Sequence, residues 1–239
     1  MRLIDFDVLT FDCYGTLIDW ESGIYNALRP WLDREGIAAD RDQALAAFAE
    51  QESAQQAETP SLRYPDLLAA VHKRLAAHWG AASSDADAAA FGASVGDWPA
   101  FPDSADSLRY LKQHYKLMIL SNVDRASFAR SNEKLGVAFD AIFTAEDIGS
   151  YKPDPANFAY LLSRLGEMGI DKSRVLHTAQ SLFHDHVPAK RAGLTTAWID
   201  RRGGDADGFG ATMPPPVDVA VDFRMPSLTA FVERHRAEA

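Results

Sequence analysis

Short apolar runs that alternate with segments of helical period set the strongest limit on how this chain can fold. Runs rich in strand-favouring residues lie at 7–11, 116–120, 141–144, 174–178, 195–199 and 217–221. Segments with helical spacing separate most of these runs, and the clearest lie at 104–114, 124–135, 154–166 and 188–192. Strands that alternate with helices are typical of a parallel sheet with helices on both faces. We therefore predict an α/β fold built on a doubly wound parallel sheet.

Residues 19–98 differ in composition from the rest of the chain. They are rich in Ala, Gln and Glu, show almost no strand signal, and include amphipathic segments at 44–57, 64–79 and 85–95. This stretch is far longer than the crossover between two parallel strands requires. We therefore expect a helical cap subdomain at 19–98, inserted after the first strand. The sheet-containing core would then consist of residues 1–18 and 99–239.

Composition narrows the classes of function. The 239 residues are 47% hydrophobic and carry a net charge of −10 without any Lys/Arg block, which argues against a nucleic-acid-binding surface. Cys13 is the only cysteine, so an intramolecular disulfide cannot form, and no apolar run approaches membrane-spanning length. We expect a cytoplasmic protein that binds neither nucleic acid nor membrane, and a homodimer stays open. The Gly- and Pro-rich stretch 203–216 is expected to be a mobile surface loop.

Polar side chains follow four of the predicted strands at the points where the strands end. Asp12 follows the first, Ser121 and Asn122 follow the second, Lys152 follows the third after a short loop, and Asp185 follows the fourth. The carboxyl ends of parallel strands meet at one edge of the sheet, where ligands bind. Any one of these residues could be a cap or a solvated side chain. Together they predict a site with a nucleophile, polar donors, a cation and a second acid.

The segments around these residues resemble the ordered motifs of a known superfamily. FDCYGTLID at 11–19, ILSN at 119–122, YKPDP at 151–155 and the acid Asp185 are similar to the four motifs of the haloacid dehalogenase-like superfamily. The resemblance covers essentially the whole chain and implies a Rossmann-like core with a helical cap. The D-x-Y-G-T form of the first motif resembles the (S)-2-haloacid dehalogenase branch, the type II enzymes, rather than the phosphatases.

This resemblance implies a role for each motif residue. Asp12 would be the nucleophile, which forms an aspartyl ester with the substrate, and Lys152 would hold it in place and keep it ionised. Asp185 would activate the water that cleaves the ester. Thr16, Ser121 and Asn122 would supply hydrogen bonds to the nucleophile or to the substrate's carboxylate.

Position 14 indicates which leaving group the site can accept. In the related phosphatases, the residue two positions after the nucleophile is an aspartate that protonates the departing alkoxide. Tyr14 stands there in this chain. A tyrosine, whose ordinary pKa is about 10, is a much weaker acid than an aspartic acid, whose ordinary pKa is about 3.9. A halide needs no proton to depart. Tyr14 therefore favours displacement of a good leaving group from carbon.

The fourth motif departs from the dehalogenase branch. That branch carries serine and asparagine where this chain has Gln180 and Leu182, and a tyrosine where it has Phe158. His184 and His186 flank the acid instead, and either could assist the water or simply belong to the start of a helix. The leading prediction is an (S)-2-haloacid dehalogenase. Hydrolytic ring opening of azetidine-2-carboxylate, a magnesium-dependent phosphatase and a non-catalytic metabolite-binding protein remain alternatives.

Further side chains are candidates for contact with a small anionic or zwitterionic carboxylic acid. No cofactor is expected, because the fourth motif offers a single acid to balance the charge of magnesium; the alternative would use Asp12, the Tyr14 carbonyl and Asp185 as ligands. Trp79 is a weaker candidate for the pocket wall. The residues expected to contact substrate are Cys13, Tyr14, Trp20, Arg63, Tyr64 and His184.

Overall fold

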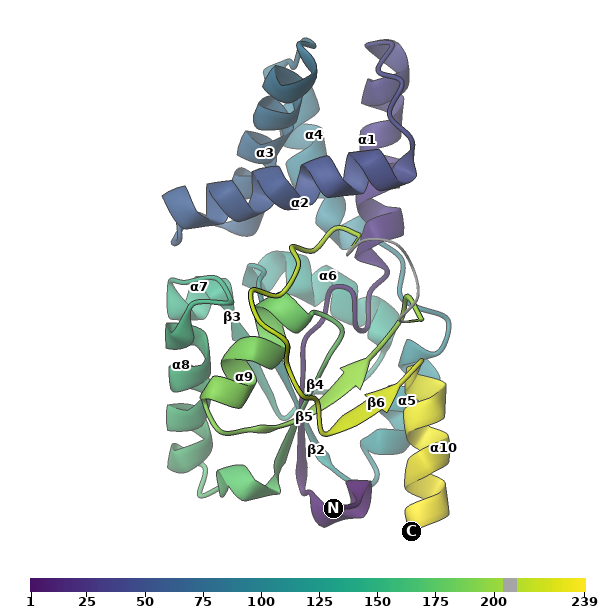
Figure 1. Cartoon of the computed structure of the whole chain (residues 1–239), viewed down its shortest axis with the longest axis vertical. Helices are drawn as coiled ribbons and strands as arrows, with labels where there is room; N and C mark the ends of the chain where they lie inside the picture. Colours follow the sequence, from purple (N-terminus) through teal and green to yellow (C-terminus); the bar gives the residue numbers. More distant parts are fainter. Residues whose placement is uncertain (204–209) are drawn as a thin grey trace.

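The structure is a computed structural model that describes residues 1–203 and 210–239, and a parallel sheet forms its centre (Figure 1). The strand order is β3-β2-β1-β4-β5-β6, and every neighbouring pair is parallel. The strands are β1(Val8–Phe11), β2(Lys116–Ser121), β3(Ala141–Thr144), β4(Val175–Ala179), β5(Thr195–Ile199) and β6(Phe223–Met225). This order confirms the predicted doubly wound α/β sheet, and it places β1 in the middle of the sheet.

Helices cover both faces of this sheet. Successive residues of a strand point to opposite faces, so Leu9 joins the hydrophobic core on one face while Val8 joins the core on the other. The Leu9 face packs against α5(Ser104–Leu111), α6(Arg125–Leu135) and α10(Leu228–Glu238). The Val8 face packs against α8(Pro155–Glu167) and α9(Val187–Arg191), and the short α7(Ala145–Ile148) follows β3.

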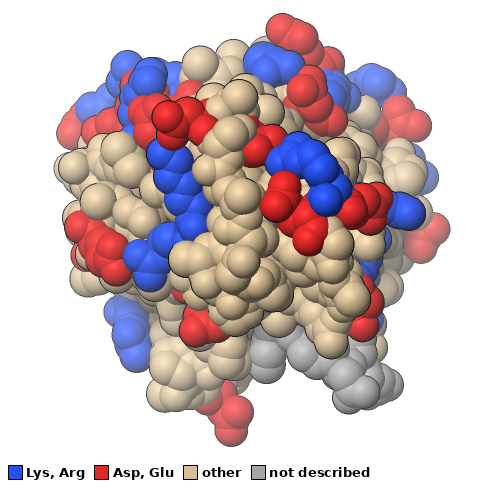
Figure 2. Space-filling view, turned by 90° about the horizontal axis from the view of Figure 1, so that it is seen from above, with Lys and Arg blue, Asp and Glu red and all other residues tan. Residues whose placement is uncertain are grey.

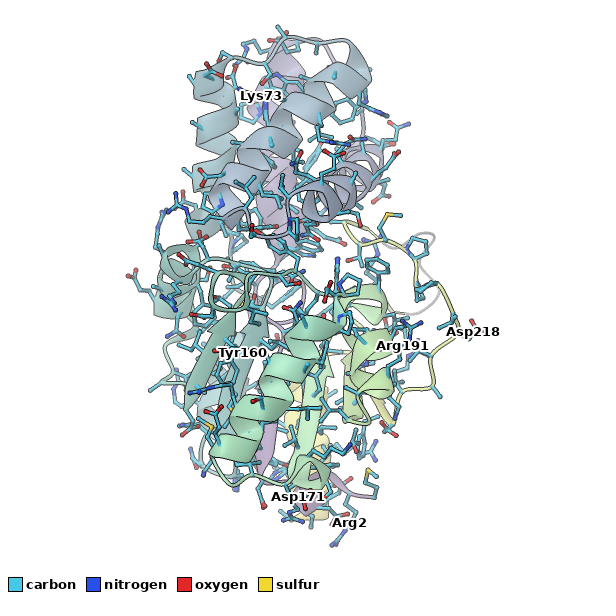
Figure 3. The ribbon with its side chains drawn as sticks, turned by 90° about the vertical axis from the view of Figure 1, so that its left-hand side faces the viewer. Arg2, Lys73, Tyr160, Asp171, Arg191 and Asp218 are labelled. Atoms are coloured by element: carbon cyan, nitrogen blue, oxygen red, sulfur yellow. The ribbon has the colours of Figure 1, made fainter. Side chains whose placement is uncertain are left out.

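Four α-helices stand between β1 and α5, at the carboxyl edge of the sheet (Figure 1). They are α1(Trp20–Arg34), α2(Arg41–Glu58), α3(Tyr64–Trp79) and α4(Asp85–Ala93), and we call them the helical insertion. Figure 3 shows Lys73 of this insertion at one end of the molecule and Asp171 at the other, beyond the amino ends of the strands. The division of the chain into a cap at 19–98 and a core stays a prediction.

The C-terminal part differs from the sequence-based expectation. The sixth strand was predicted at 217–221, but Val217 is 50% exposed and the strand lies at Phe223–Met225. Three prolines at 214–216 precede the predicted run, and prolines lack the N–H that a sheet requires. In the strand, two buried apolar residues flank an exposed arginine. This apolar–charged–apolar alternation at 223–225 is too short to be found by a search for longer apolar runs. Helix α10 was not predicted, although Ser227 caps it by accepting from the Ala230 N–H.

Surface features bear on the expected partners. Lys/Arg and Asp/Glu side chains are interspersed on the face seen in Figure 2, which looks down on the helical insertion. Among the described residues, no helix combines the length and the apolar character needed to cross a membrane. The loop expected at 203–216 includes residues 204–209, which lie outside the described part of the chain, so its mobility stays a prediction.

Candidate active site

Asp12 lies directly after β1, at the carboxyl edge of the central strand. Its backbone N–H donates to the Thr178 carbonyl over 3.1 Å, which extends the β1–β4 pairing by one residue. Thr16 Oγ1 donates to Asp12 Oδ2 over 2.8 Å, and Lys152 Nζ donates to Oδ1 over 3.0 Å. Each carboxylate oxygen is therefore held by a donor, and the buried side chain has a fixed orientation.

Gly15 makes the turn that brings Thr16 back to Asp12. Its φ of +94° lies in a region that side-chain-bearing residues rarely adopt. A Cβ at this position would also lie 3.0 Å from Gln180 Oε1 and 3.1 Å from Trp20 Nε1. The turn thus needs glycine both for its backbone angle and for the close approach of these side chains.

Lys152 joins the two acids of the site. Its side chain is 1% exposed, and Nζ donates to Asp12 Oδ1 at 3.0 Å, to Asp185 Oδ1 at 2.6 Å and to the Leu120 carbonyl at 3.0 Å. An ammonium has three N–H donors, so these contacts use all of them. Asn122 fixes the backbone of the same residue, because its Oδ1 accepts from the Lys152 N–H at 2.7 Å and its Nδ2 donates to the Lys152 carbonyl at 2.9 Å.

Asp185 has a second partner that the sequence analysis missed. His177 of β4 places Nε2 2.9 Å from Asp185 Oδ1 and Nδ1 2.9 Å from Thr10 Oγ1. Phe158 packs edge-on against the His177 ring at 5.1 Å between centroids, at the position where the dehalogenase branch would have its tyrosine. The sequence does contain a signal for this contact, because His177 is a single histidine inside a largely apolar strand. A buried polar ring needs hydrogen-bond partners, so such a histidine indicates a polar neighbour.

The two carboxyl groups have opposite pKa shifts. Burial raises the pKa of Asp12, and the nearby charge of Asp185 raises it further. The Lys152 ammonium lowers it, but the net shift is upward. Burial also acts to raise the pKa of Asp185, but Lys152 and His177 outweigh it and hold that pKa below its usual range. Burial acts to lower the pKa of Lys152, yet the two acids keep it raised. Different environments assign different roles to paired carboxyl groups, and here Asp185 is the firmly ionised member.

A cavity opens between these residues and the helical insertion. Trp20 at the start of α1 and Tyr64 at the start of α3 contribute to its wall, as expected, and the nucleophile and His184 face them. Figure 3 shows side chains filling the region where the insertion meets the sheet. The lining residues are Asp12, Tyr14, Trp20, Glu52, Gln56, Tyr64, Asn122, Lys152, Ser181, His184 and Asp185.

Several predicted residues do not line this cavity. Cys13 is fully buried in the hydrophobic core, so its thiol is a packing group and not a substrate contact. The Arg63 side chain is 63% exposed and pairs with Asp66, which corrects its proposed role in the pocket. Trp79 also lies elsewhere, with its ring against Trp31 at 6.0 Å between centroids. Thr16 does not line the cavity either, but it donates a hydrogen bond to Asp12 and so helps to orient the nucleophile.

Ser121 is also absent from the cavity wall. Its side chain is buried beside the site at the end of β2, and its Oγ has no hydrogen-bond partner among the described residues. The structure therefore places Ser121 next to the site without giving it a contact to Asp12.

Tyr14 lines the cavity, and its phenol is hydrogen-bonded to Ser131 on α6. Its hydroxyl lies 2.9 Å from Ser131 Oγ on α6, and burial raises the pKa of this phenol well above its ordinary value. A phenol that is engaged with Ser131 and whose pKa is raised is a poor proton donor for a departing alkoxide. This observation supports the interpretation of position 14.

His184 and His186 have different surroundings. His184 Nδ1 lies 3.3 Å from Ser181 Oγ, while its Nε2 is buried without a partner among the described residues. His186 places Nε2 2.9 Å from the Ala179 carbonyl and lies outside the cavity wall. Burial lowers the pKa of each ring to about 4, so both are neutral at pH 7. Of the two, only His184 is placed to contact a substrate.

Glu52 is the main residue in the cavity that sequence reasoning missed. It lies on α2, is 3% exposed, and accepts a 2.7 Å hydrogen bond from the Tyr64 hydroxyl through Oε1. Burial raises the pKa of Glu52 to about 7. Phe48, Glu52 and Gln56 recur at intervals of four and are all buried. That spacing, which puts them on one helix face, was the signal that could have found it.

The described residues fit a divalent metal poorly. No cluster of three or more His, Cys, Asp or Glu side chains in this part of the chain could hold a metal ion. Asp12 and Asp185 are two carboxylates near each other, but the Lys152 ammonium is bonded to both. A hard dication prefers several oxygen ligands, and it would have to compete with this cation.

Comparison with known proteins places this geometry in a family. A family model described as haloacid dehalogenase-like hydrolase matches residues 6–179, which include the nucleophile turn, Lys152 and β4. The chain therefore belongs to the haloacid dehalogenase-like hydrolases, and it is an enzyme of that class.

Individual relatives point in the same direction. The chain is 26% identical over 212 residues to the (S)-2-haloacid dehalogenase H-109 of Pseudomonas putida, which covers 85% of this chain and 90% of the relative. Its fold is similar to that of the L-2-haloacid dehalogenase from Xanthobacter autotrophicus with chloropropionic acid covalently bound (TM-score 0.74, 22% identity, 98% and 100% coverage). It is also similar to YfnB from Bacillus subtilis, a HAD-hydrolase bound to magnesium (TM-score 0.76, 18% identity, 99% and 100% coverage).

Proposed function

We propose that this enzyme displaces a leaving group from C2 of a short carboxylic acid through an ester with Asp12, with 2-halo acids as the first substrate class to test. The observation that carries the proposal is the surroundings of Asp12. The carboxylate is held by Lys152 and Thr16, while the Tyr14 phenol is hydrogen-bonded to Ser131 and burial raises its pKa, which makes it a poor acid. Such a site suits attack on carbon with a leaving group that departs without acid assistance.

The reaction would proceed in two displacements. An Asp12 oxygen attacks C2 with inversion, the C2–halogen bond breaks, and the halide departs with the electron pair. Water then attacks the Asp12 carboxyl carbon, and Asp185, whose Oδ2 has no hydrogen-bond partner among the described residues, accepts its proton. The ester C–O bond breaks at that carbon, and the departing alkoxide takes the proton from Asp185. The product therefore takes its hydroxyl oxygen from Asp12. An (S)-2-halo acid would give the (R)-2-hydroxy acid.

Hydrolytic ring opening of azetidine-2-carboxylate is the second candidate. The ring nitrogen is protonated at neutral pH, so it can leave as an amine without an acid at position 14. One observation favours it, namely that Glu52 adds a third carboxyl group to the cavity wall. A magnesium-dependent phosphatase is less consistent with Tyr14 and with the ammonium between Asp12 and Asp185. A non-catalytic metabolite-binding role would not explain why Lys152 and Thr16 hold the Asp12 carboxylate in a fixed orientation.

A turnover screen tests the proposal. Purified protein is incubated with (S)-2-chloropropionate, azetidine-2-carboxylate or an aryl phosphate, each with EDTA or with added magnesium. We expect hydrolysis of a carbon substrate that EDTA leaves unchanged, and loss of that turnover in Asp12→Asn. Magnesium-dependent release of phosphate as the only activity would contradict the proposal, and absence of turnover on every compound would favour the non-catalytic alternative.

A further inference from the structure

The charged groups of the cavity do not balance. Three carboxyl groups line it, on Asp12, Glu52 and Asp185, and Lys152 is the one cation among the described lining residues. Each N–H of that ammonium already has an acceptor within the protein. A halide leaving C2 would therefore find no free cation in the wall, whereas a positively charged group on the substrate would find a surplus of negative charge.

Glu52 is the carboxyl group of this set that has no cationic partner. Lys152 is bonded to both of the other acids, and no Lys, Arg or His nitrogen of the described residues pairs with Glu52. Its single hydrogen bond in that part of the chain comes from Tyr64. Isolated buried carboxylates are costly, and a wall position with spare acceptor capacity is what a cationic ligand requires.

The neighbours of Glu52 do not supply that positive charge. Tyr64 of α3 donates to it, and Tyr151, between α7 and α8, is a neutral phenol that donates to the Leu62 carbonyl. Across the cavity lie Asp12, Asp185, the saturated Lys152 and the neutral ring of His184. The same helix contributes Gln56, a neutral amide that could meet the substrate's carboxylate.

We propose that Glu52 is a specificity-determining residue whose carboxylate receives a protonated amine of the substrate, so that the enzyme prefers strained cyclic 2-amino acids to 2-halo acids. This inference rests on the proposed function and names its substrate class. Asp12 attacks C2, the C2–N bond breaks, and the ammonium nitrogen keeps the bonding pair. It leaves as a neutral amine, which then takes a proton from water. Glu52 holds that nitrogen on the side of C2 away from the nucleophile.

Kinetics of Glu52→Gln test this proposal, with Glu50→Gln as the matched control because Glu50 lies two residues away on α2 and is exposed. Loss of a charge-assisted hydrogen bond weakens binding by about tenfold or more. We therefore expect kcat/KM for azetidine-2-carboxylate to fall at least about tenfold in Glu52→Gln, chiefly through KM. Hydrolysis of (S)-2-chloropropionate should rise above the wild-type rate at pH values above about 7, where the wild-type carboxylate is ionised, and Glu50→Gln should match the wild type. Equal effects on both substrates, or none, would overturn the proposal.

The pH profile gives a second readout, because Glu52 ionises near pH 7. In the wild type, kcat/KM for azetidine-2-carboxylate should rise as the pH increases through about 7, while that for (S)-2-chloropropionate should fall there. Both limbs should disappear in Glu52→Gln, whose fold is checked by circular dichroism. Parallel profiles for the two substrates, or limbs that persist in the variant, would overturn the assignment of Glu52.

Binding of unreactive isosteres separates this inference from the chemistry. L-alanine and isobutyrate differ in having an ammonium or a methyl group, and NMR titration measures both. We expect the wild type to prefer L-alanine at least about tenfold and Glu52→Gln to lose that preference. Turnover of 2-chloropropionate without a preference for L-alanine would overturn this inference and leave the proposed function. A preference for L-alanine without any turnover would support the role of Glu52 while the proposed function fails.

Discussion

Lys152 illustrates what can be deduced about a single residue before the structure is known. Its position after the third strand and its resemblance to a motif lysine predicted a contact with Asp12, and the structure has that contact at 3.0 Å. The sequence could not reveal that the same ammonium also binds Asp185 and the Leu120 carbonyl. Those contacts depend on how loops from three strands converge, and no local pattern encodes that convergence.

Removing this cation is the sharpest test at the residue scale. Lys152→Met leaves two buried carboxylates without their shared partner, and breaking a buried ion pair costs about 3 to 5 kcal/mol. We expect a loss of that order in the free energy of unfolding measured with urea, together with near-complete loss of turnover. Lys73→Met is the control, since Lys73 pairs with Asp85 at the surface and such pairs contribute less than about 1 kcal/mol. Equal stability of the two variants would contradict the central position of Lys152.

Tyr14→Phe tests whether the phenol takes part in the chemistry. The hydroxyl is hydrogen-bonded to Ser131 on α6. We expect turnover within about threefold of the wild type, and a loss of about 1 kcal/mol in the free energy of unfolding from the missing hydrogen bond. A fall in kcat of about a hundredfold or more, the size of a lost general acid, would show instead that Tyr14 protonates the leaving group.

At the scale of elements, helix α2 shows the limit of periodicity as a guide. Helical spacing predicted a helix at 44–57, and the structure has one at Arg41–Glu58. Periodicity does not say what a buried helix face contacts, and the Phe48–Glu52–Gln56 stripe faces both the insertion and the active-site cavity. Residue type alone suggested Arg63 of the helical insertion as a pocket residue, but its side chain is exposed. The spacing could therefore have indicated that Glu52 lies on a buried helix face, but not that this face lines the active-site cavity.

The cost of keeping Glu52 in this helix should depend on pH. Its folded-state pKa of about 7 lies above the ordinary value of 4.5, so the folded state retains a proton that the unfolded state loses. Stability from this group is present below pH 4.5 and falls as the pH rises towards 7. We expect Glu52→Gln to be more stable than the wild type by about 1 to 3 kcal/mol at pH 8, and to differ little at pH 4.5. Urea unfolding at the two pH values measures this, and an equal difference at both would contradict the shift.

At the scale of the whole molecule, the order of strands and helices was predictable because most strands are continuous apolar runs buried on both faces. The exceptions are edge elements. β6 is a three-residue strand with an exposed central residue, and α10 has a weak apolar stripe, so neither gives a strong local signal. His177 was missed for a related reason, since a polar residue inside a buried strand is understood only when its partner from another loop is known.

The fold as a whole is proposed to position Asp12 for attack on a carbon atom of the substrate. Transfer of ¹⁸O from water tests this proposal most directly. Excess enzyme is mixed with its carbon substrate in ¹⁸O-water for a single turnover, and the peptide containing Asp12 is analysed by mass spectrometry. We predict that ¹⁸O enters the Asp12 carboxylate and that the hydroxy acid formed in this turnover is unlabelled. Label in the hydroxy acid, with Asp12 unlabelled, would mean that water attacks the substrate directly and would contradict the ester mechanism.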